Sequence, residues 1–366
     1  MMTRRLFLIG TAAMGRAAAG SVWTPAVGGH VWEFPRDHYS HDGYRTEWWY
    51  LTGVLEAEGG GRYGFQFTIF RRGVRPVGAR EAVRSRFVKD DFAMGHFTLS
   101  DVRARRFRFG QRLSRGAFGE AGFGKSGEAR LAWIEGNELR LEEDGSMKLV
   151  ARPDGESSLE LEMRPTGAAV VHGEGGLSRK AAGEGNASLY YSLTRMAAAG
   201  TVRCDGRERK VPGRVWLDRE WASNQLAPGQ IGWDWFSLSL SDGSDLMLYR
   251  LRNASGTDPF SSGTLVREGG GQRHLKSGDF TMTPGETWRS AATGGEYPVE
   301  WVLEVPSERL RLTVRAEFPE QELALTPVAY WEGMIAARGE AAGREVTAEG
   351  YLEMTGYAAA LRALQR

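Results

Sequence analysis

Residues 215–252 of the sequence read VWLDREWASNQLAPGQIGWDWFSLSLSDGSDLMLYRLR. Their side chains alternate in character with a period of two, which is typical of strands whose two faces differ in burial. The segment SDGSD at 241–245 is a turn signal between two apolar runs. The stretch therefore predicts a β-hairpin that carries acidic residues.

Two carboxylates share one face of the first predicted strand. Trp216, Asp218 and Glu220 point to the same side, because successive side chains of a strand alternate between its faces. We take Asp218 as the leading candidate for a catalytic acid. Glu220 is either a second acid or an ion-pair partner of Arg219, and the sequence leaves both open.

A third acid, Asp234, lies in line with apolar residues of the second strand, while Trp233 and Trp235 share the opposite face. A carboxylate on an apolar face is costly unless it is paired, protonated or functional. Asp234 is therefore either paired with Arg250 or Arg252 on the next strand, or it lines a pocket as a further catalytic candidate.

The composition favours strands over helices. The 366 residues include 49 Gly, 12 Trp, 11 Tyr and 16 Phe, which suit tight turns and aromatic-rich strands. The net charge of +1 gives no general attraction to nucleic acid. Cys204 is the single cysteine, which excludes an intrachain disulfide and a cysteine-rich zinc site. We predict an all-β protein and expect no cofactor and no metal.

The N-terminal residues 1–26 are predicted to be an export signal. Thr3-Arg4-Arg5 precedes an apolar, small-residue run that ends in Ala17-Ala18-Ala19, as in a twin-arginine signal with its cleavage site. The prediction is a periplasmic or secreted protein. The alternative is a cytosolic protein with a basic N-terminus.

A second aromatic hairpin is predicted between Phe34 and Arg72. Trp48 alternates with Trp49 on its first strand, and the EGGG turn at 58–61 reverses the chain. Both tryptophans are candidate ligand-binding residues. Short alternating runs with Gly, Asn, Asp or Pro between them then predict a meander of strands.

The domain division is predicted near residue 200. A Gly-rich loop at 172–188 precedes the strand LYYSLTR, which places Tyr190 and Tyr191 on opposite faces. We expect one β-barrel domain at 27–200 and a second at 201–366, because closed barrels hide sheet edges. A short C-terminal helix is predicted from Ala358 to Arg366.

Several long motifs resemble one known family. The motifs are TEWWYLTG at 46–53, YGFQFTIFR at 63–71, GWDWFSLSL at 232–240, DGSDLMLYRLR at 242–252, DPFSSGTL at 258–265 and YWEG at 330–333. Together they are similar to the AttH/carotenoid 1,2-hydratase family, over nearly all of the chain after the signal. The resemblance implies two lipocalin-like antiparallel β-barrel domains in tandem. Many members are labelled only as predicted secreted hydrolases.

The hydratase branch of that family implies a role for one residue. It adds water across a terminal isoprenoid double bond with an aspartate in a strand that resembles Tyr-x-Asp-His, and the matching position is Asp218. Trp216 stands at the tyrosine position and Arg219 at the histidine position. The upstream His-x-Trp element has no counterpart near Leu189.

The chemistry expected of Asp218 is proton transfer to an alkene. Burial among aromatic rings keeps a carboxyl protonated near neutral pH, and ring faces stabilise a carbocation. The aromatic residues expected to line the ligand site are Trp48, Trp49, Tyr190, Tyr191, Trp216, Trp233 and Trp235. The alternative is that these rings only fill two barrel interiors.

Two functions stay open. In the first, an exported enzyme uses Asp218, with Glu220 or Asp234, for hydration, dehydration or cyclisation of an isoprenoid or acyl ligand, carotenoid hydration included. In the second, a non-catalytic carrier moves a lipid across the periplasm, associated with an export system or a membrane. Both have an apolar small molecule as partner.

Three other site types are disfavoured. His38 and His41 lie near Glu47 and could bind a metal, but loop hydrogen bonds explain such residues more often. No G-x-S-x-G elbow of a serine hydrolase is present. The arginines of RARRFRF at 103–109 alternate as on a solvated strand face, so we expect no nucleic-acid partner.

Overall fold

The computed structural model describes residues 22–80, 88–222, 224, 226–326, 328–359 and 361. The predicted signal lies outside the described residues as far as residue 21. Most of the predicted C-terminal helix also lies outside them. No helix among the described residues is both long and apolar enough to cross a membrane.

The first sheet is antiparallel and contains every strand before residue 223. Its strands are β1 (Thr46–Ala57), β2 (Gly61–Gly73), β3 (Asp91–Asp101), β4 (Arg106–Ser114), β5 (Ala121–Phe123), β6 (Arg130–Ile134), β7 (Asn137–Leu141), β8 (Met147–Ala151), β9 (Ser158–Pro165), β10 (Val170–Val171), β11 (Leu177–Arg179), β12 (Ala187–Cys204) and β13 (Arg207–Ala222). The order is β4-β3-β2-β1-β13-β12-β9-β8-β7-β6-β5, with β10 and β11 beside β12. Its ends curl toward each other, since a Cβ on Gly95 of β3 would lie 2.9 Å from Ile134 of β6.

The second sheet contains most of the later strands. They are β14 (Gln230–Leu240), β15 (Asp245–Asn253), β16 (Gly256–Thr257), β17 (Ser262–Val266), β18 (Gln272–Lys276), β19 (Thr281–Pro284), β22 (Glu300–Val305), β23 (Leu310–Ala316), β24 (Glu322–Leu323), β25 (Tyr330–Ala341) and β26 (Arg344–Thr355). The order is β18-β17-β15-β14-β26-β25-β23-β22-β19. β20 (Thr287–Arg289) and β21 (Glu296–Pro298) form a separate pair, and the helical pieces are η1 (Arg36–His38), α1 (Val77–Arg80), η2 (Ala117–Gly119) and η3 (Pro306–Glu308).

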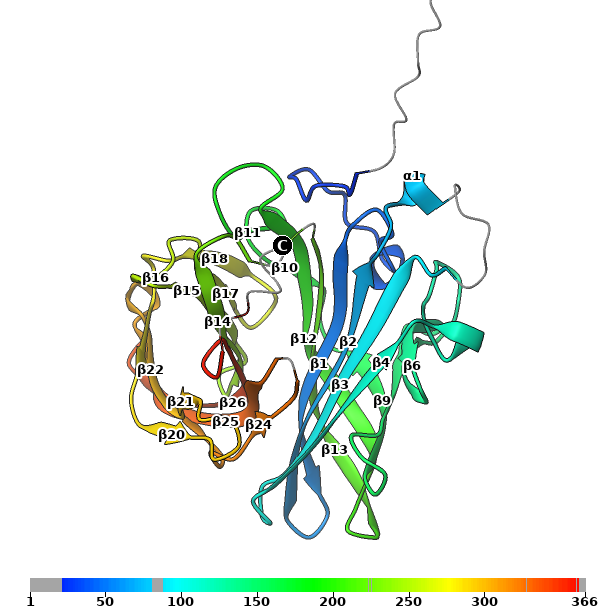
Figure 1. Ribbon diagram of the computed structural model, residues 1–366. Helices are drawn as coiled ribbons and strands as arrows, with labels where there is room; N and C mark the ends of the chain where they lie inside the picture. The colour runs from blue at the N-terminus through cyan, green and yellow to red at the C-terminus, as the bar shows by residue number, and fades with distance from the viewer. Residues whose placement is uncertain are drawn as a thin grey trace, which may run out of the picture.

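The all-β prediction is confirmed, and the two curved sheets lie side by side (Figure 1). The predicted division at residue 200 falls inside β12, which pairs with β13 along nearly its whole length. The sheets therefore divide between Ala222 and Gln230. The tight Asp205-Gly206 turn, where both residues have positive φ, only joins two strands of one sheet.

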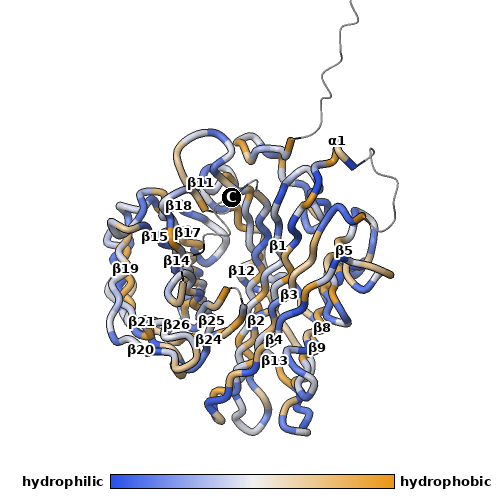
Figure 2. The backbone as a smooth tube through the Cα atoms, viewed as in Figure 1, coloured by the Kyte–Doolittle hydropathy of each residue, from blue (hydrophilic) through white to orange (hydrophobic). Residues whose placement is uncertain are grey.

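Each sheet curves around its own apolar core. Leu217 and Trp221 point into the first core, and Phe236 and Leu238 point into the second. Hydrophilic and hydrophobic residues alternate along the strands (Figure 2). The outward residues of both sheets meet in a third buried cluster, which includes Tyr50.

This third cluster joins the sheets, because β1 and β2 pack against β25 and β26. Gly64 on β2 permits the approach, since a Cβ there would lie 2.5 Å from the Tyr351 hydroxyl of β26. Polar contacts reinforce the packing. Ser100 donates to Gln321 at 2.8 Å, and Arg62 pairs with Glu349 at 2.7 Å.

Candidate functional site

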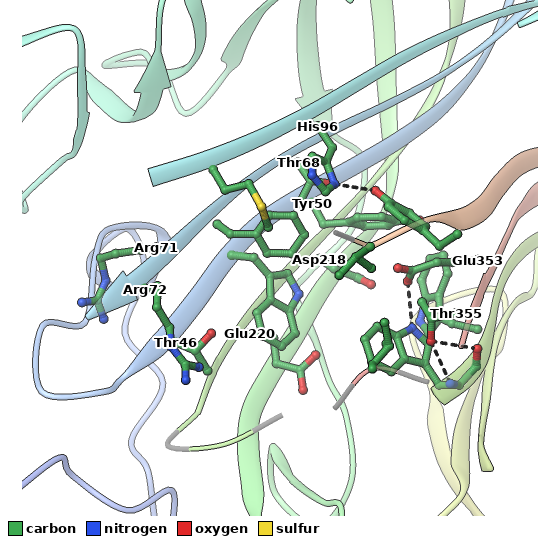
Figure 3. A pocket seen from close by; sticks show the side chains of 18 of the residues that line it. Thr46, Tyr50, Thr68, Arg71, Arg72, His96, Asp218, Glu220, Glu353 and Thr355 are labelled. Carbon is green, nitrogen blue, oxygen red and sulfur yellow. Dashed lines mark hydrogen bonds between the residues drawn. The ribbon is translucent and has the colours of Figure 1, made fainter. Parts of the chain in front are cut away.

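A cavity of about 370 Å³ lies between the two sheets, outside both of their cores. The first sheet contributes residues of β1, β2, β3, β4, β12 and β13, and the second contributes residues of β14, β15, β25 and β26. In Figure 3, Arg71, Arg72 and Thr46 lie at one end, Glu353 and Thr355 lie at the other, and Asp218 lies between them.

The cavity walls are mainly apolar and aromatic. The residues with such side chains are Trp48, Tyr50, Phe70, Phe92, Met94, Tyr190, Trp233, Trp235, Tyr249, Leu251, Val328, Tyr330 and Leu361. Ligand pockets are commonly lined in this way, with a few polar groups that fix the orientation of the ligand. The lining therefore suits an apolar molecule.

Asp218 is the acid at the centre of the cavity, and its residue is only 4% exposed. Tyr190 donates to its Oδ2 atom at 2.6 Å, and Trp216 donates to its Oδ1 atom at 2.6 Å. Ser192 also donates to Oδ1. Burial raises the pKa of Asp218 to about 7, although these three hydrogen bonds oppose the rise. The group therefore exchanges a proton near neutral pH.

A buried histidine stands behind Asp218. Nε2 of His172 lies 2.6 Å from the hydroxyl of Ser192, and its Nδ1 lies 2.9 Å from the hydroxyl of Thr264 on β17. Burial, with the nearby Lys180, lowers the pKa of His172 to about 3, so its ring is neutral. Ser192 thereby links the carboxyl of Asp218 to a neutral imidazole.

Two further acids come from the second sheet. Glu353 on β26 lines the cavity and accepts the indole N–H of Trp233 at 3.1 Å. Glu332 lies directly opposite Glu353 on β25 and accepts the hydroxyl of Tyr50 at 2.8 Å. Burial raises the pKa of Glu353 to about 7 and that of Glu332 well above its ordinary value.

Glu220 is paired with Lys180, not with Arg219. The Nζ atom of Lys180 lies 3.0 Å from Glu220 Oε1 and 4.3 Å from the ring centroid of Tyr249. Burial lowers the pKa of Lys180, but Glu220 and Tyr249 outweigh burial and raise it overall. The cavity therefore contains an ion pair beside two acids of raised pKa, Asp218 and Glu353.

His96 on β3 is a neutral donor and acceptor in the cavity wall. Its Nε2 lies 3.0 Å from the amide nitrogen of Gln111, and its Nδ1 lies 2.8 Å from the hydroxyl of Tyr330 across the sheet boundary. Because an amide nitrogen only donates, the proton of His96 is on Nδ1. Burial lowers its pKa to about 4.

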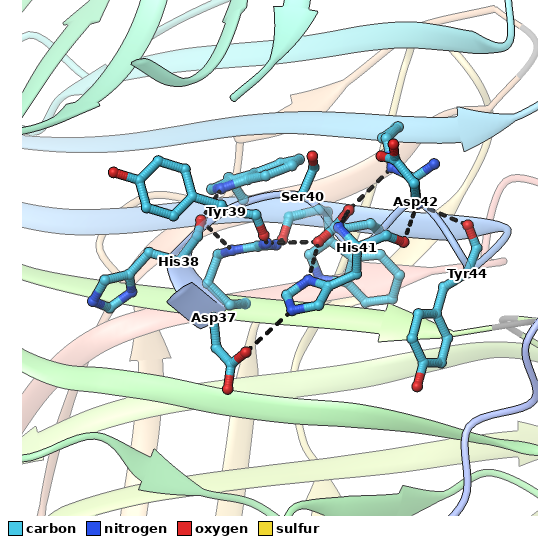
Figure 4. A network of polar contacts seen from close by, with 12 residues as sticks. Asp37, His38, Tyr39, Ser40, His41, Asp42 and Tyr44 are labelled. Carbon is cyan, nitrogen blue, oxygen red and sulfur yellow. Dashed lines mark hydrogen bonds and ion pairs between the residues drawn. The ribbon is translucent and has the colours of Figure 1, made fainter. Parts of the chain in front are cut away.

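A buried ionic network links the strands that line the cavity, on the face that is turned away from the cavity. Glu47 on β1 pairs with Arg219 on β13 at 2.7 Å, with Arg71 on β2 at 3.0 Å and with His41 at 2.7 Å. Burial raises the pKa of Glu47, but Arg219, His41 and Arg71 outweigh it and hold the pKa below its ordinary value. Figure 4 shows His41 joined to Asp37 within this loop network.

The predicted residues divide by strand face. The candidates that line the cavity are Trp48, Tyr190, Asp218, Glu220, Trp233 and Trp235. Trp216 lies beside the cavity and donates a hydrogen bond to Asp218. Trp49 and Tyr191 point instead into the first core, where Trp49 stacks on Phe123 and Tyr191 bonds His38.

Asp234 lies outside the cavity, so the structure supports the paired alternative for it. Arg250 and Arg252 contact its Oδ2 atom at 2.7 and 3.2 Å, and Tyr357 donates to its Oδ1 atom at 2.9 Å. The side chain of Asp234 points away from the first sheet, whereas the neighbouring side chains of Trp233 and Trp235 on β14 point toward it.

The sequence interpretation missed His96, Lys180, Glu332 and Glu353 as site residues. The acid in the YWEG motif at 330–333 and the acid in the last strand, GYLEMTGY, were visible signals. The Gly-rich loop around Lys180 carried no strand pattern that could place it.

One group of possible metal ligands is present among the described residues. Asp101, Cys204 and Asp205 place one ligand atom each within 4.8 Å of one another. Asp205 is paired with Arg106 and Arg108, so its carboxylate already has cationic partners.

The chain is similar to known proteins both in sequence and in structure. The family model described as AttH-like matches residues 25–357. A crystal structure of an AttH-type protein from Nitrosomonas europaea has a TM-score of 0.81 and 31% identity, over 91% of this chain and 99% of that chain. None of the curated proteins matches.

Two solved structures of lower identity share the fold. Kievitone hydratase from Nectria haematococca has a TM-score of 0.69 and 14% identity, over 92% of this chain and 96% of its own. CghA has a TM-score of 0.52 and 12% identity, over 85% and 88%. The lipocalin-like fold that the motifs imply is confirmed.

Proposed function

Because the chain belongs to the AttH-like family, we propose that it binds an apolar ligand between its two sheets and that Asp218 transfers a proton to that ligand. The observation that carries this proposal is a buried carboxyl group in an apolar cavity, with a pKa raised to about 7. A carboxylic acid that is still protonated near neutral pH can act as a general acid, which an exposed aspartate cannot.

The reaction class that fits is addition or removal of water, or cyclisation, at a carbon–carbon double bond. Proton transfer from Asp218 to an alkene creates a carbocation, and the rings of Trp48, Trp233 and Trp235 would stabilise it. The name of one protein with the same fold, kievitone hydratase, is consistent with this class.

The ligand proposed is an isoprenoid or an acyl chain. A cavity of about 370 Å³ lies in the range of pockets that enclose small organic molecules. Carotenoid hydration remains a narrower form of the proposal. Arg219 stacks on Trp49 of the first core and pairs with Glu47, so the departure from the hydratase pattern that bears on the cavity is Trp216, which donates to Asp218.

The experiment is identification of the small molecules that stay bound to the protein purified from cells. Mass spectrometry would compare wild type, Asp218→Asn and the control Glu208→Gln, where Glu208 is an exposed acid paired with Arg203. The proposal predicts that Asp218→Asn alone accumulates an unconverted precursor. Identical ligands in all three proteins would contradict catalysis by Asp218.

A second candidate function is a lipid carrier. The three donors to Asp218 also satisfy this carboxyl as a purely structural group, which a carrier would need. A carrier would yield the same bound lipid from wild type and from Asp218→Asn. The same extraction therefore separates the two candidates.

Export through a twin-arginine pathway to the periplasm or the exterior is part of the proposal, and it rests on Arg4, Arg5 and the small-residue run that follows. Association with an export system or a membrane would follow from that location. Cell fractionation of wild type and of an Arg4→Lys, Arg5→Lys double variant tests export. Equal partitioning of the two proteins would contradict it.

A further inference from the structure

Two buried carboxyl groups of the second sheet lie directly opposite each other. Glu332 on β25 and Glu353 on β26 are cross-strand partners, and the residue Glu332 is fully buried. Like charges in directly opposite positions destabilise a sheet. The pair is therefore compatible with the fold only if at least one carboxyl group holds a proton.

Glu332 is the member of the pair that is held neutral. Tyr50 donates to its Oε1 atom, but its Oε2 atom has no hydrogen-bond partner within the described part of the chain. A buried carboxylate oxygen without a donor is costly, and protonation removes most of that cost. Glu332 thus stands behind Glu353 as a neutral neighbour.

Glu353 is the member that reaches the cavity. Its carboxyl group accepts one hydrogen bond, from Trp233, and lines the same cavity as Asp218, which comes from the opposite sheet. Burial raises the pKa of Glu353 to about 7, and the nearby Asp218 and Glu220 add to the rise. Two carboxyl groups that interact strongly lose their protons in two steps that belong to both groups together.

Asp218 and Glu353 are the acids of the cavity that are available for proton transfer to a ligand. Glu220 is paired with Lys180, and Arg71 is paired with Glu47 and Asp91. The remaining ionisable groups that line the cavity are Tyr50, Arg72, His96, Tyr190, Tyr249 and Tyr330.

We propose that Glu353 is a second catalytic residue, which acts as the base while Asp218 acts as the acid on one ligand held between the two sheets. The proposal rests on the function proposed above and adds the group that activates the nucleophile. In the state that reacts, Asp218 is protonated and Glu353 is ionised.

The hydration step is balanced with these two groups and one water molecule. The π electrons of the alkene take the proton from Asp218, which leaves a carboxylate and a carbocation. Water donates a lone pair to the carbocation, and its O–H bond breaks as Glu353 takes the proton. Transfer of that proton from Glu353 back to Asp218 through solvent restores the starting state, so the net change is addition of water.

Side-chain carboxyl titration by carbon-13 NMR tests, without any ligand, whether Asp218 and Glu353 interact. In Glu353→Gln the ionisation constant of Asp218 is expected to rise about tenfold, because a neighbouring carboxylate is removed. Asp218→Asn should change Glu353 in the same direction. Glu208→Gln, at an exposed acid, is the control and should change neither. Unchanged titration of each group in the absence of the other would overturn the proposal.

Solvent deuterium incorporation separates failure of the pairing from failure of the proposed function. The probe is geranylgeraniol, an isoprenoid alcohol with trisubstituted double bonds, incubated with the full chain in heavy water. Glu353→Gln is expected to retain deuterium exchange into the alkene and to lose hydration, because Asp218 alone can give and retake a proton. Asp218→Asn is expected to lose both.

Different outcomes test the role of Glu353 as a base and the role of Asp218 as an acid. Full hydration by Glu353→Gln, with none by Asp218→Asn, would overturn the role of Glu353 and leave Asp218 as the acid. Neither exchange nor hydration by wild type would contradict the proposed function for this class of isoprenoid, and the carboxyl titration would still decide whether the two acids are paired.

Discussion

Tyr190 on β12 donates its hydroxyl proton to the Oδ2 atom of Asp218 on the neighbouring strand β13, at 2.6 Å. The next residue, Tyr191, points to the opposite face and bonds His38 in the first core at 2.6 Å. Two adjacent tyrosines thus belong to different environments, and only the first one touches the acid of the cavity. This division follows from the alternation of side chains along a strand.

The two tyrosines provide a matched test of how the pKa of Asp218 is set. Tyr190→Phe removes a hydrogen bond that favours the carboxylate, so the pKa of Asp218 is expected to rise by about one pH unit. Tyr191→Phe should leave it unchanged. Carbon-13 titration of Asp218 measures both effects, and an equal shift in the two variants would contradict the assignment.

The pH dependence of stability should change in Asp218→Asn. The folded-state pKa of Asp218 lies near 7 and the ordinary value is 3.8, so the folded protein binds more protons than the unfolded chain between these values. Stability from this group is therefore full at low pH and declines as pH rises from about 4 to about 7. The decline amounts to about 2–4 kcal/mol and should be absent in the variant.

Chemical unfolding at a series of pH values measures this decline. Glu208→Gln is a control, because Glu208 is an exposed partner of Arg203. Parallel stability curves for wild type and Asp218→Asn would show that Asp218 is not protonated in the folded protein.

Glu47→Gln should destabilise the protein strongly. The substitution leaves Arg71 and Arg219 buried without their shared carboxylate, and breaking a buried ion pair costs about 3–5 kcal/mol. The pKa of Glu47 is held below its ordinary value, so its contribution is present above that value and is lost as the pH falls. Urea unfolding at neutral pH measures the loss, and a change no larger than that of Glu208→Gln would contradict a structural role.

Gly64→Ala should disturb the junction of the sheets. The new methyl group would meet the Tyr351 hydroxyl and Met334, so the expected cost is about 1–3 kcal/mol with a change in the environment of cavity tryptophans. Gly278→Ala is the control, because a Cβ there meets open space. Unfolding followed by tryptophan fluorescence compares the two, and a neutral Gly64→Ala would contradict close packing at this point.

The alternation of residues 215–252 was sufficient to predict which candidates share a face. Trp216, Asp218 and Glu220 do lie on one side of β13, and Trp233 and Trp235 on one side of β14. The predicted resemblance to the AttH family is confirmed. The pattern could not show that these faces meet each other between the sheets, because contact between distant strands depends on tertiary packing.

The site residues that the sequence did not reveal were missed for the same physical reason. Glu332 and Glu353 lie more than 110 residues after Asp218 in sequence. They approach it only because β25 and β26 pack against β1 and β2. Lys180 comes from a loop without periodicity. The sequence places Trp49 and Tyr191 on the strand faces opposite Trp48 and Tyr190, but it does not show which face borders the ligand site and which enters the core.

Whether Asp218 can act as an acid is tested most directly by titration of its carboxyl carbon in the unmodified full chain, assigned by comparison with Asp218→Asn. We expect a midpoint near 7, which means that a proton donor is present in the cavity at neutral pH. A midpoint near the ordinary value of 3.8 would contradict it, because Asp218 would then be a carboxylate with no proton to give.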